Sequence, residues 1–350
     1  MQVISRTWDS LASASETIFD AVGYTPLVKL GRISQGLGPD IFAKIEWYSP
    51  TGSLKDRIYE QMISRAEARG ELTSGKVILE CSSGNAGIAC AAASAVKGFK
   101  CIIVMPEMMS PERKKMIRAF GAELITTPGG ESDVDVALAR MKEMAASEPE
   151  KYWVPAEFEN MDNVDTHFTT SGPEIWEQLG GDVDALIAAV GTGGWLTGVG
   201  RFLREKNPKL KIYGVEPTES PLISEGVCCG HGIAGIGDGL IPNILDLSII
   251  DGIITASTEE SLRMARRASR EEGLFCGISS GCNLAAALKF ARSYPEIGRI
   301  VTIFGDSGQR YFSTPLCHDE SGMEAALQDV IEGDRETMLQ KFRASWEIIE

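Results

Sequence analysis

The chain has 350 residues, of which 43% are hydrophobic and 24% are charged, and its formal net charge at pH 7 is −15. That length allows two domains with substantial cores, and the negative charge argues against nucleic acid or an anionic membrane surface as a partner. No apolar run reaches the roughly 18 residues of a membrane-spanning helix, and residues 1–6 are not followed by the hydrophobic region of a signal peptide, so we expect a cytoplasmic protein.

Short apolar or β-branched runs alternate along the chain with longer segments of helical periodicity. We predict strands at residues 41–47, 77–80, 101–105, 123–126, 185–190, 211–215 and 299–304. Helical patterns lie between several of these strands, as at 111–120 and 134–146. The alternation predicts an α/β fold of mostly parallel sheets covered by helices, with ligands bound at the carboxyl ends of the strands.

The strand at 41–47 leads through the turn residues 50–53 to Lys55, which is followed by Asp56 and Arg57. Lysines attack carbonyl groups when desolvation or a nearby cation lowers their pKa, and the end of a buried strand is a place where this happens. Lys55 is therefore the candidate centre of the chemistry. Taken alone, a lysine beside an aspartate and an arginine is more often a solvated surface charge.

Two glycine-containing loops each follow a predicted strand and precede a helical pattern, at residues 82–87 and 191–198. A helix N-terminus of this kind offers free backbone N–H groups that suit a carboxylate or a phosphate. Neither loop contains G-x-x-x-x-G-K-[ST], so a nucleotide triphosphatase is not supported. A tight strand-to-helix turn without a ligand is the alternative interpretation. Two further glycine segments follow, at 277–281 and 305–314.

Taken together and in this order, these segments resemble the cysteine synthase and cystathionine β-synthase family of pyridoxal-phosphate enzymes, known as fold type II. The resemblance extends from Gly23 to Thr314. It implies a two-domain fold in which each domain has a mostly parallel sheet. The larger domain is expected from residues 15–48 and 161–330 and the smaller one, with the substrate-carboxylate loop, from 49–160, with the cofactor in the cleft between them.

The resemblance also assigns roles to individual residues. Lys55 is expected to form the internal aldimine with pyridoxal 5′-phosphate and then to act as general base at the substrate Cα. Ser279 is expected to face the pyridine nitrogen, where a neutral hydroxyl favours β-elimination over transamination. The cofactor phosphate is assigned to Gly191, Thr192, Gly193 and Gly194, with Thr197 as a further candidate. Asn85 is expected to bind the 3′ oxygen of the cofactor, and the substrate carboxylate is assigned to Ser82, Ser83, Gly84 and Asn85.

Several positions depart from the family pattern. Glu157 stands where a glutamine is usual, so a carboxylate replaces an amide near the substrate carboxylate and would repel it unless protonated or turned away. Ala86 and Trp195 each replace a threonine, and Trp195 either shapes the pocket or packs beneath the loop. Asp238 stands where a small residue is usual. It is either a base for water or another nucleophile, or a loop-capping aspartate.

The function that follows is β-replacement or β-elimination on a small L-amino acid through an aminoacrylate intermediate. The family default is cysteine synthesis from O-acetylserine or O-phosphoserine and sulfide. One alternative is a cysteine lyase that releases sulfide and adds water or another nucleophile, with Asp238 as base. Another is a catalytically idle partner of serine acetyltransferase, although the retained Lys55 and Ser279 argue against it.

Two regions lie outside this assignment. Residues 331–350 carry apolar side chains at helical spacing and predict a terminal amphipathic helix, which either packs on its own subunit or contributes to the interface of a homodimer. The eight cysteines lack C-x-x-C spacing, so no metal site is predicted. Cys228, Cys229 and His231 leave a metal or redox site as an alternative, but no second ligand pair is visible.

Overall fold

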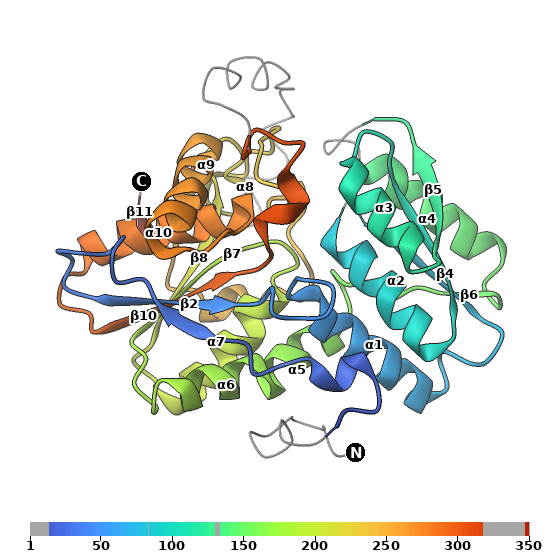
Figure 1. The fold of residues 1–350 in the computed structure, drawn as a ribbon, viewed down its shortest axis with the longest axis horizontal. Coiled ribbons are helices and arrows are strands. Elements are labelled where there is room, and N and C mark those ends of the chain that lie inside the picture. Colours follow the sequence, from blue (N-terminus) through green and yellow to red (C-terminus); the bar gives the residue numbers. More distant parts are fainter. Residues whose placement is uncertain (1–13, 83, 130–133, 318–346, 350) are drawn as a thin grey trace.

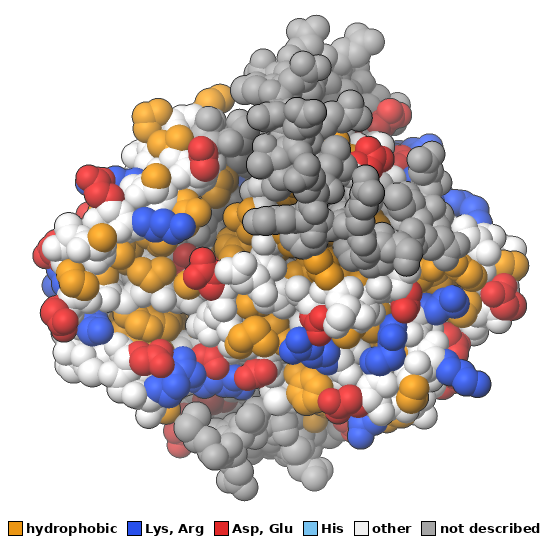
Figure 2. All heavy atoms as spheres, turned by 180° about the vertical axis from the view of Figure 1, so that it is seen from behind, with side chains coloured by type: hydrophobic (Ala, Val, Ile, Leu, Met, Phe, Trp, Pro, Cys, Tyr) orange, Lys and Arg blue, Asp and Glu red, His pale blue; other side chains and the backbone are white. Residues whose placement is uncertain are grey.

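The computed structural model describes residues 14–82, 84–129, 134–317 and 347–349, which form two β-sheets with helices on their faces. Figure 1 shows the larger sheet and its helices on the left and the smaller sheet and its helices on the right. Within these ranges no helix is long and apolar enough to cross a membrane. On the described part of the face in Figure 2, acidic and basic side chains are intermingled.

The larger sheet has seven strands, and all its neighbouring strands are parallel except β1 and β2. In sheet order these strands are β1 (Leu27–Lys29), β2 (Asp40–Ile45), β10 (Arg299–Phe304), β7 (Ala185–Ala189), β8 (Lys211–Pro217), β9 (Gly252–Ala256) and β11 (Glu347–Ile349). The smaller sheet is parallel throughout. Its order is β5 (Glu123–Thr127), β4 (Lys100–Pro106), β3 (Val77–Cys81) and β6 (Tyr152–Trp153).

Helices cover both sheets. Those that pack with the smaller sheet are α1 (Lys55–Arg69), α2 (Asn85–Lys97), α3 (Pro111–Ala119) and α4 (Val134–Ser147). The remaining α-helices belong to the larger part and are α5 (Met161–Thr169), α6 (Ser171–Gln178), α7 (Gly194–Lys206), α8 (Leu222–Glu225), α9 (Thr258–Arg267) and α10 (Ile278–Ser293). Short helical turns occur at Ile18–Ala21, Leu247–Ile249, Ala268–Glu272 and Gly308–Tyr311.

The strands of the larger sheet are apolar on both faces because helices cover both. Neighbouring residues of β7 enter different hydrophobic clusters: Ile187 belongs to one that includes Phe290 of α10, whereas Leu186 belongs to one that includes Leu203 of α7. All four side chains are almost completely buried. This explains why the sequence shows continuous apolar runs rather than alternation.

The predicted α/β class is confirmed, and each predicted strand and the helices predicted at 111–120 and 134–146 are present within two residues of their expected ends. Strands β1, β6 and β9 were not predicted from the sequence. The expected terminal helix is wrong for Glu347–Ile349, which form a strand parallel to β9. The rest of that predicted helix lies outside the described residues. The proposed domain boundaries stay a prediction, although every strand except β11 lies on the expected side of them.

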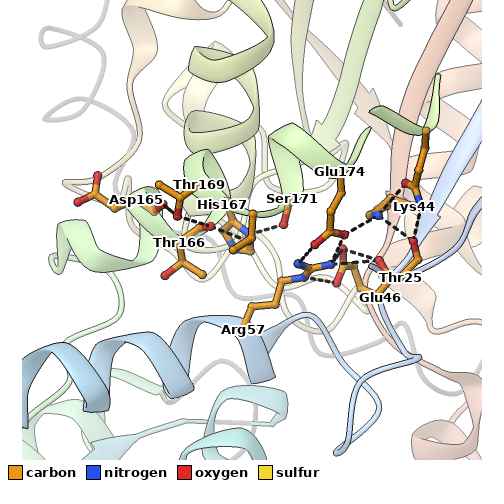
Figure 3. Close-up of polar contacts among 12 residues, drawn as sticks. Thr25, Lys44, Glu46, Arg57, Asp165, Thr166, His167, Thr169, Ser171 and Glu174 are labelled. Carbon is orange, nitrogen blue, oxygen red and sulfur yellow. Dashed lines mark hydrogen bonds and ion pairs between the residues drawn. The ribbon is translucent and has the colours of Figure 1, made fainter. Parts of the chain in front are cut away.

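A group of buried charges connects α1 to the larger sheet (Figure 3). Arg57, in the first turn of α1, is only 2% exposed. Its Nε lies 2.8 Å from Glu46 Oε2, and its Nη1 lies 2.6 Å from Glu174 Oε1 on α6. The third guanidinium nitrogen, Nη2, donates to the Thr25 hydroxyl at 3.1 Å. Every partner comes from the larger sheet or its helices, whereas the apolar face of α1 packs with the smaller sheet.

Lys44 of β2 completes this buried charge cluster, which we define as Lys44, Glu46, Arg57 and Glu174. Its Nζ lies 2.7 Å from Glu174 Oε2 and donates to the Thr25 carbonyl oxygen at 2.8 Å. Burial alone would raise the pKa of Glu174, but the attraction and hydrogen bonds of Arg57 and Lys44 outweigh it and hold that pKa at about 2. The cluster therefore contains two cations and two carboxyl groups.

Replacing Glu174 tests this cluster. We expect Glu174→Gln to lower the free energy of unfolding at pH 7 by roughly 3–5 kcal/mol, because it leaves two buried cations with too little negative charge. Since the pKa of Glu174 is about 2 in the folded protein against an ordinary 4.5, its contribution is complete above pH 4.5 and is lost as the pH falls towards 2. Denaturant titrations at several pH values should show the difference shrinking over that window.

Glu71→Gln is the matched control, since Glu71 pairs with Arg69 at 2.7 Å but has 49% of its side chain exposed. Its loss should stay below about 1 kcal/mol. Equal losses for the two variants would mean that the buried charge cluster contributes no more than a surface ion pair.

Candidate active site

One cavity collects most of the residues that the sequence singled out. It has a volume of about 90 Å³ and lies where the chain leaves the carboxyl ends of β3, β7 and β10, the edge at which α/β sheets bind ligands. Its lining draws on both sheets. The predicted residues in it are Lys55, Ser82, Gly84, Asn85, Glu157, Thr192, Asp238 and Ser279. Ser83 lies outside the described residues.

Lys55 is the first residue of α1 and follows a turn that is fixed at two points. The Asp56 carboxylate accepts hydrogen bonds from the Thr51 hydroxyl and backbone N–H, and the Leu54 N–H donates to the Gly305 carbonyl oxygen at 2.9 Å. Lys55 Nζ lies 2.7 Å from Glu157 Oε2, and only 15% and 6% of the two side chains are exposed. The candidate nucleophile is therefore half of a largely buried ion pair beside the cavity.

The turn between β3 and α2 is shaped by Ser82. Its hydroxyl accepts hydrogen bonds from the backbone N–H groups of Gly84 at 3.1 Å and Gly87 at 2.8 Å. Helix α2 begins at Asn85, so the partial positive charge of its N-terminus lies at the cavity and suits a carboxylate. Arg113 of α3 also lines the cavity next to Gly84. The sequence analysis had not identified this second cation.

The loop between β7 and α7 is a backbone cradle whose glycine positions leave no room for side chains. A Cβ at Gly191 would collide with the Gly235 carbonyl oxygen, and one at Gly194 would collide with the Asn163 side chain. Gly193 has φ of +78°, a conformation that favours glycine. The cradle ends at the N-terminus of the 13-residue helix α7, which suits a phosphate.

Two threonines predicted to hold a phosphate occupy different surroundings. Thr192 lines the cavity, and its hydroxyl accepts a hydrogen bond from Asn163 Nδ2 at 3.2 Å. Thr197 is fully buried in α7, its hydroxyl accepts the Asp246 N–H at 3.1 Å, and it is not among the described residues that line the cavity. Trp195 belongs to the hydrophobic cluster of α7, which favours packing beneath the loop over shaping the pocket.

Asp238 reaches the cavity from a loop with three glycines in left-handed conformations, Gly235, Gly237 and Gly239. The loop is supported by His231, whose Nε2 lies 3.1 Å from the Gly237 carbonyl oxygen. The other ring nitrogen of His231 accepts the Ile233 N–H at 3.2 Å, so backbone groups engage both. The histidine near Cys228 and Cys229 therefore holds the Asp238 loop.

A second carboxyl group, Glu80 of β3, is affected by the charge of Glu157. Its oxygens accept hydrogen bonds from the Cys81 N–H at 2.8 Å and from the Tyr59 hydroxyl at 3.0 Å. Burial, reinforced by repulsion from Glu157, raises the pKa of Glu80 to about 8. Glu80 is therefore mostly protonated at pH 7, whereas Glu157 is the direct partner of Lys55, at 2.7 Å.

These features fit a phosphorylated aldehyde. The glycine cradle and the α7 N-terminus can hold the phosphate, and Lys55 can capture the carbonyl carbon. Ser279, near the start of α10, adds a neutral hydroxyl, and Asn85 adds an amide. Asp306 and Tyr311 also line the cavity, and Asn163 contacts it through its hydrogen bond to Thr192. Asp306 and Tyr311 stand in the glycine segment at 305–314, but none of the three residues was assigned a role from the sequence.

Comparisons with known proteins agree with this chemistry. A family model described as "Pyridoxal-phosphate dependent enzyme" matches residues 18–306. Cysteine synthase of Staphylococcus aureus is 41% identical over 302 residues, which are 86% of this chain and 96% of the relative. The structure of a cysteine synthase from Entamoeba histolytica has a TM-score of 0.84 and 36% identity, covering 97% of this chain and 98% of its own. A hydrogen sulfide-producing enzyme from Fusobacterium nucleatum has a TM-score of 0.82 and 38% identity, covering 85% and 100%.

The two threonines allow a matched test of the cradle. Thr192→Val should weaken binding of pyridoxal phosphate to the apoprotein by roughly 1–3 kcal/mol, the cost of a lost hydrogen bond to a charged group. Thr197→Val removes a hydroxyl of the same kind from α7, which follows the loop. It should leave that affinity unchanged and lower only the stability. Absorbance titrations of both variants decide the assignment. Weaker binding in the Thr197 variant alone would reverse it.

Proposed function

We propose, since this chain belongs to the family of pyridoxal-phosphate dependent enzymes, that it catalyses β-replacement on a small L-amino acid. The favoured reaction is cysteine synthesis, in which sulfide displaces acetate from O-acetylserine or phosphate from O-phosphoserine. One observation carries the proposal. Lys55 and Thr192 of the glycine cradle line the same cavity in a chain that is 41% identical to cysteine synthases over 86% of its length.

The chain's residues fit the cofactor of its family. Lys55 would hold the aldehyde carbon, the cradle and Thr192 the phosphate, and Asn85 and Ser279 the oxygen and nitrogen of the ring. The close packing at Gly191 and Gly194 supports this, because a Cβ there would collide with Gly235 and Asn163 and so displace the loop whose backbone N–H groups, at the start of α7, suit a phosphate. Bound pyridoxal phosphate withdraws electrons from the Cα of an attached amino acid and so makes its proton acidic.

The ion pair of Lys55 supports a role for Glu157 in proton transfer. An ammonium group neither attacks a carbonyl nor accepts the Cα proton, so Lys55 Nζ must first lose a proton. Its hydrogen-bond acceptor is Glu157 Oε2 at 2.7 Å, and we assign the uptake of that proton to this oxygen. The free Nζ can then take the proton from the substrate Cα.

The substrate carboxylate fits the turn at Ser82 and Gly84. Backbone N–H groups at the start of α2 and the Arg113 guanidinium favour an anion there, whereas Glu157 disfavours one. Arg113 therefore offsets the charge that Glu157 adds relative to the usual glutamine. The arrangement supports a substrate with one carboxylate and a small side chain.

A second candidate function is the conversion of cysteine and water into serine and sulfide. Two observations favour it: Asp238 lines the cavity, and one similar structure is of a hydrogen sulfide-producing enzyme. A carboxylate there would accept a proton from water while the water oxygen forms a bond to the substrate Cβ. In the alternative interpretation, Asp238 caps its own loop and does not activate water.

Further predictions concern partners and location. We keep a homodimer, a cytoplasmic location and binding of serine acetyltransferase as proposals. An idle scaffold for that partner is less well supported than an enzyme, because Lys55, Asn85 and Ser279 all line the cavity. The domain boundaries at residues 48–49 and 160–161 also remain proposals.

Paired assays of the purified holoenzyme separate the candidate reactions. Cysteine formation from O-acetylserine or O-phosphoserine and sulfide should exceed sulfide release from cysteine if the chain is a synthase. The reverse ranking would favour the lyase. Failure of both reactions, in protein that has bound its cofactor, would contradict the proposed function.

Asp238→Asn tests the role of the loop. If Asp238 activates water, sulfide release from cysteine should fall roughly 10²- to 10⁴-fold, the contribution of a general base. An added thiol should restore turnover, because a thiolate arrives without a proton to lose. Asp182→Asn, at a side chain that is 62% exposed, is the control and should leave the rate unchanged. A rate unchanged in the Asp238 variant would leave this residue a structural role only.

A further inference from the structure

Asp306 lies at the junction of three segments that carry predicted cofactor contacts. It follows β10, is 1% exposed and lines the cavity. Its backbone forms an antiparallel bridge with Ser53, two residues before Lys55. Its carbonyl oxygen accepts the Gly277 N–H at 3.1 Å, two residues before Ser279.

The Asp306 side chain extends this junction to the third segment. Its Oδ2 accepts hydrogen bonds from Asn85 Nδ2 and from the Tyr311 hydroxyl, each at 2.7 Å. On the other end of the same amide, Arg310 Nη1 donates to Asn85 Oδ1. Asn85 is therefore held by a carboxylate at its nitrogen and by a guanidinium at its oxygen.

This contact fixes the orientation of the amide. A carboxylate only accepts and a guanidinium only donates, so a flipped Asn85 would place oxygen against Asp306 and N–H against Arg310. Asn85 Nδ2 carries two N–H bonds, and Asp306 uses one of them. The second is left for an acceptor in the cavity.

The Asp306 and Arg310 side chains occupy space that is open because the neighbouring residues are glycines. A Cβ at Gly277 would collide with Asp306 Oδ1, and a Cβ at Gly52 would lie 3.2 Å from Arg310 Nη2. Gly52 and Gly277 belong to the turns that precede Lys55 and Ser279. The packing thus ties the two charged groups to the same turns that carry the cofactor contacts.

We propose that Asp306 and Arg310 are positioning residues that clamp the Asn85 amide in the one orientation that donates to pyridoxal phosphate. The clamp connects the start of α2, on the smaller sheet, to the segment after β10 of the larger one. The inference rests on the proposal that Asn85 contacts the cofactor. It assigns to the two charged residues an effect that passes through Asn85.

A double-mutant cycle on cofactor affinity tests this dependence. Asp306→Asn exchanges a charged acceptor for a neutral one and should weaken binding of pyridoxal phosphate to the apoprotein roughly 10-fold. In the Asn85→Ala background the same change should cost less than about 2-fold, because no amide remains to be oriented. Arg310→Met should show the same pattern from the other end of the amide. Asp165→Asn, at a side chain that is 57% exposed, is the control and should leave the affinity unchanged in both backgrounds.

The outcomes distinguish failure of the Asn85 assignment from failure of the clamp. If Asn85→Ala alone leaves cofactor affinity unchanged, the assignment of Asn85 fails. If Asn85→Ala weakens binding but Asp306→Asn and Arg310→Met cost as much in that background as in the otherwise unchanged chain, the clamp is overturned. The clamp is also overturned if neither changes the affinity. Should Asp306→Asn fail to fold, judged by thermal unfolding of the apoprotein, the Arg310→Met cycle alone decides.

Discussion

Arg57 is a permanent positive charge that the fold buries almost completely, and the position of Lys55 depends on how that charge is compensated. The partners of Arg57 are fixed by elements of the larger sheet, whereas the rest of α1 packs with the smaller one. An uncompensated buried charge is strongly unfavourable, so the first turn of α1 lies where Arg57 can reach Glu46 and Glu174. Lys55, two residues earlier, is thereby held at the boundary between the two sheets.

The cavity combines this constraint with backbone that approaches too closely for side chains. Glycines at 191 and 194 bring the cradle against Gly235 and Asn163, and α7 begins there. Lys55 and Arg113 supply positive charge to a cavity that Glu157, Asp238 and Asp306 also line, while burial keeps Glu80 mostly neutral at pH 7. Binding of an anionic cofactor and an anionic substrate therefore depends on these two cations and on the N-termini of α2 and α7, in a chain whose charge as a whole is −15.

Much of the fold could be predicted, because continuous apolar runs indicate strands that are buried on both faces and glycine loops indicate the ends of those strands. The family motifs then placed Lys55, Asn85, Thr192 and Ser279 around one cavity, as the structure has them. Partners distant in the sequence could not be predicted. The ion pair of Lys55 and Glu157 spans 102 positions, and nothing local distinguishes a buried threonine at 197 from one at the cavity. The helix predicted for the terminal residues failed for another reason. The apolar spacing over 331–350 is helical and gave no indication that Glu347–Ile349 add a strand beside β9.

We propose that Lys55 binds the cofactor covalently at the boundary between the sheets. Borohydride reduction of the holoenzyme converts a lysine–cofactor bond into a stable secondary amine, and mass spectrometry of the digested protein then locates the modified lysine. We predict the pyridoxyl phosphate mass on the peptide that contains Lys55 and its loss in Lys55→Ala. Modification of a different lysine, or an unmodified Lys55 in protein that retains its cofactor absorbance, would rule out Lys55 as the covalent ligand.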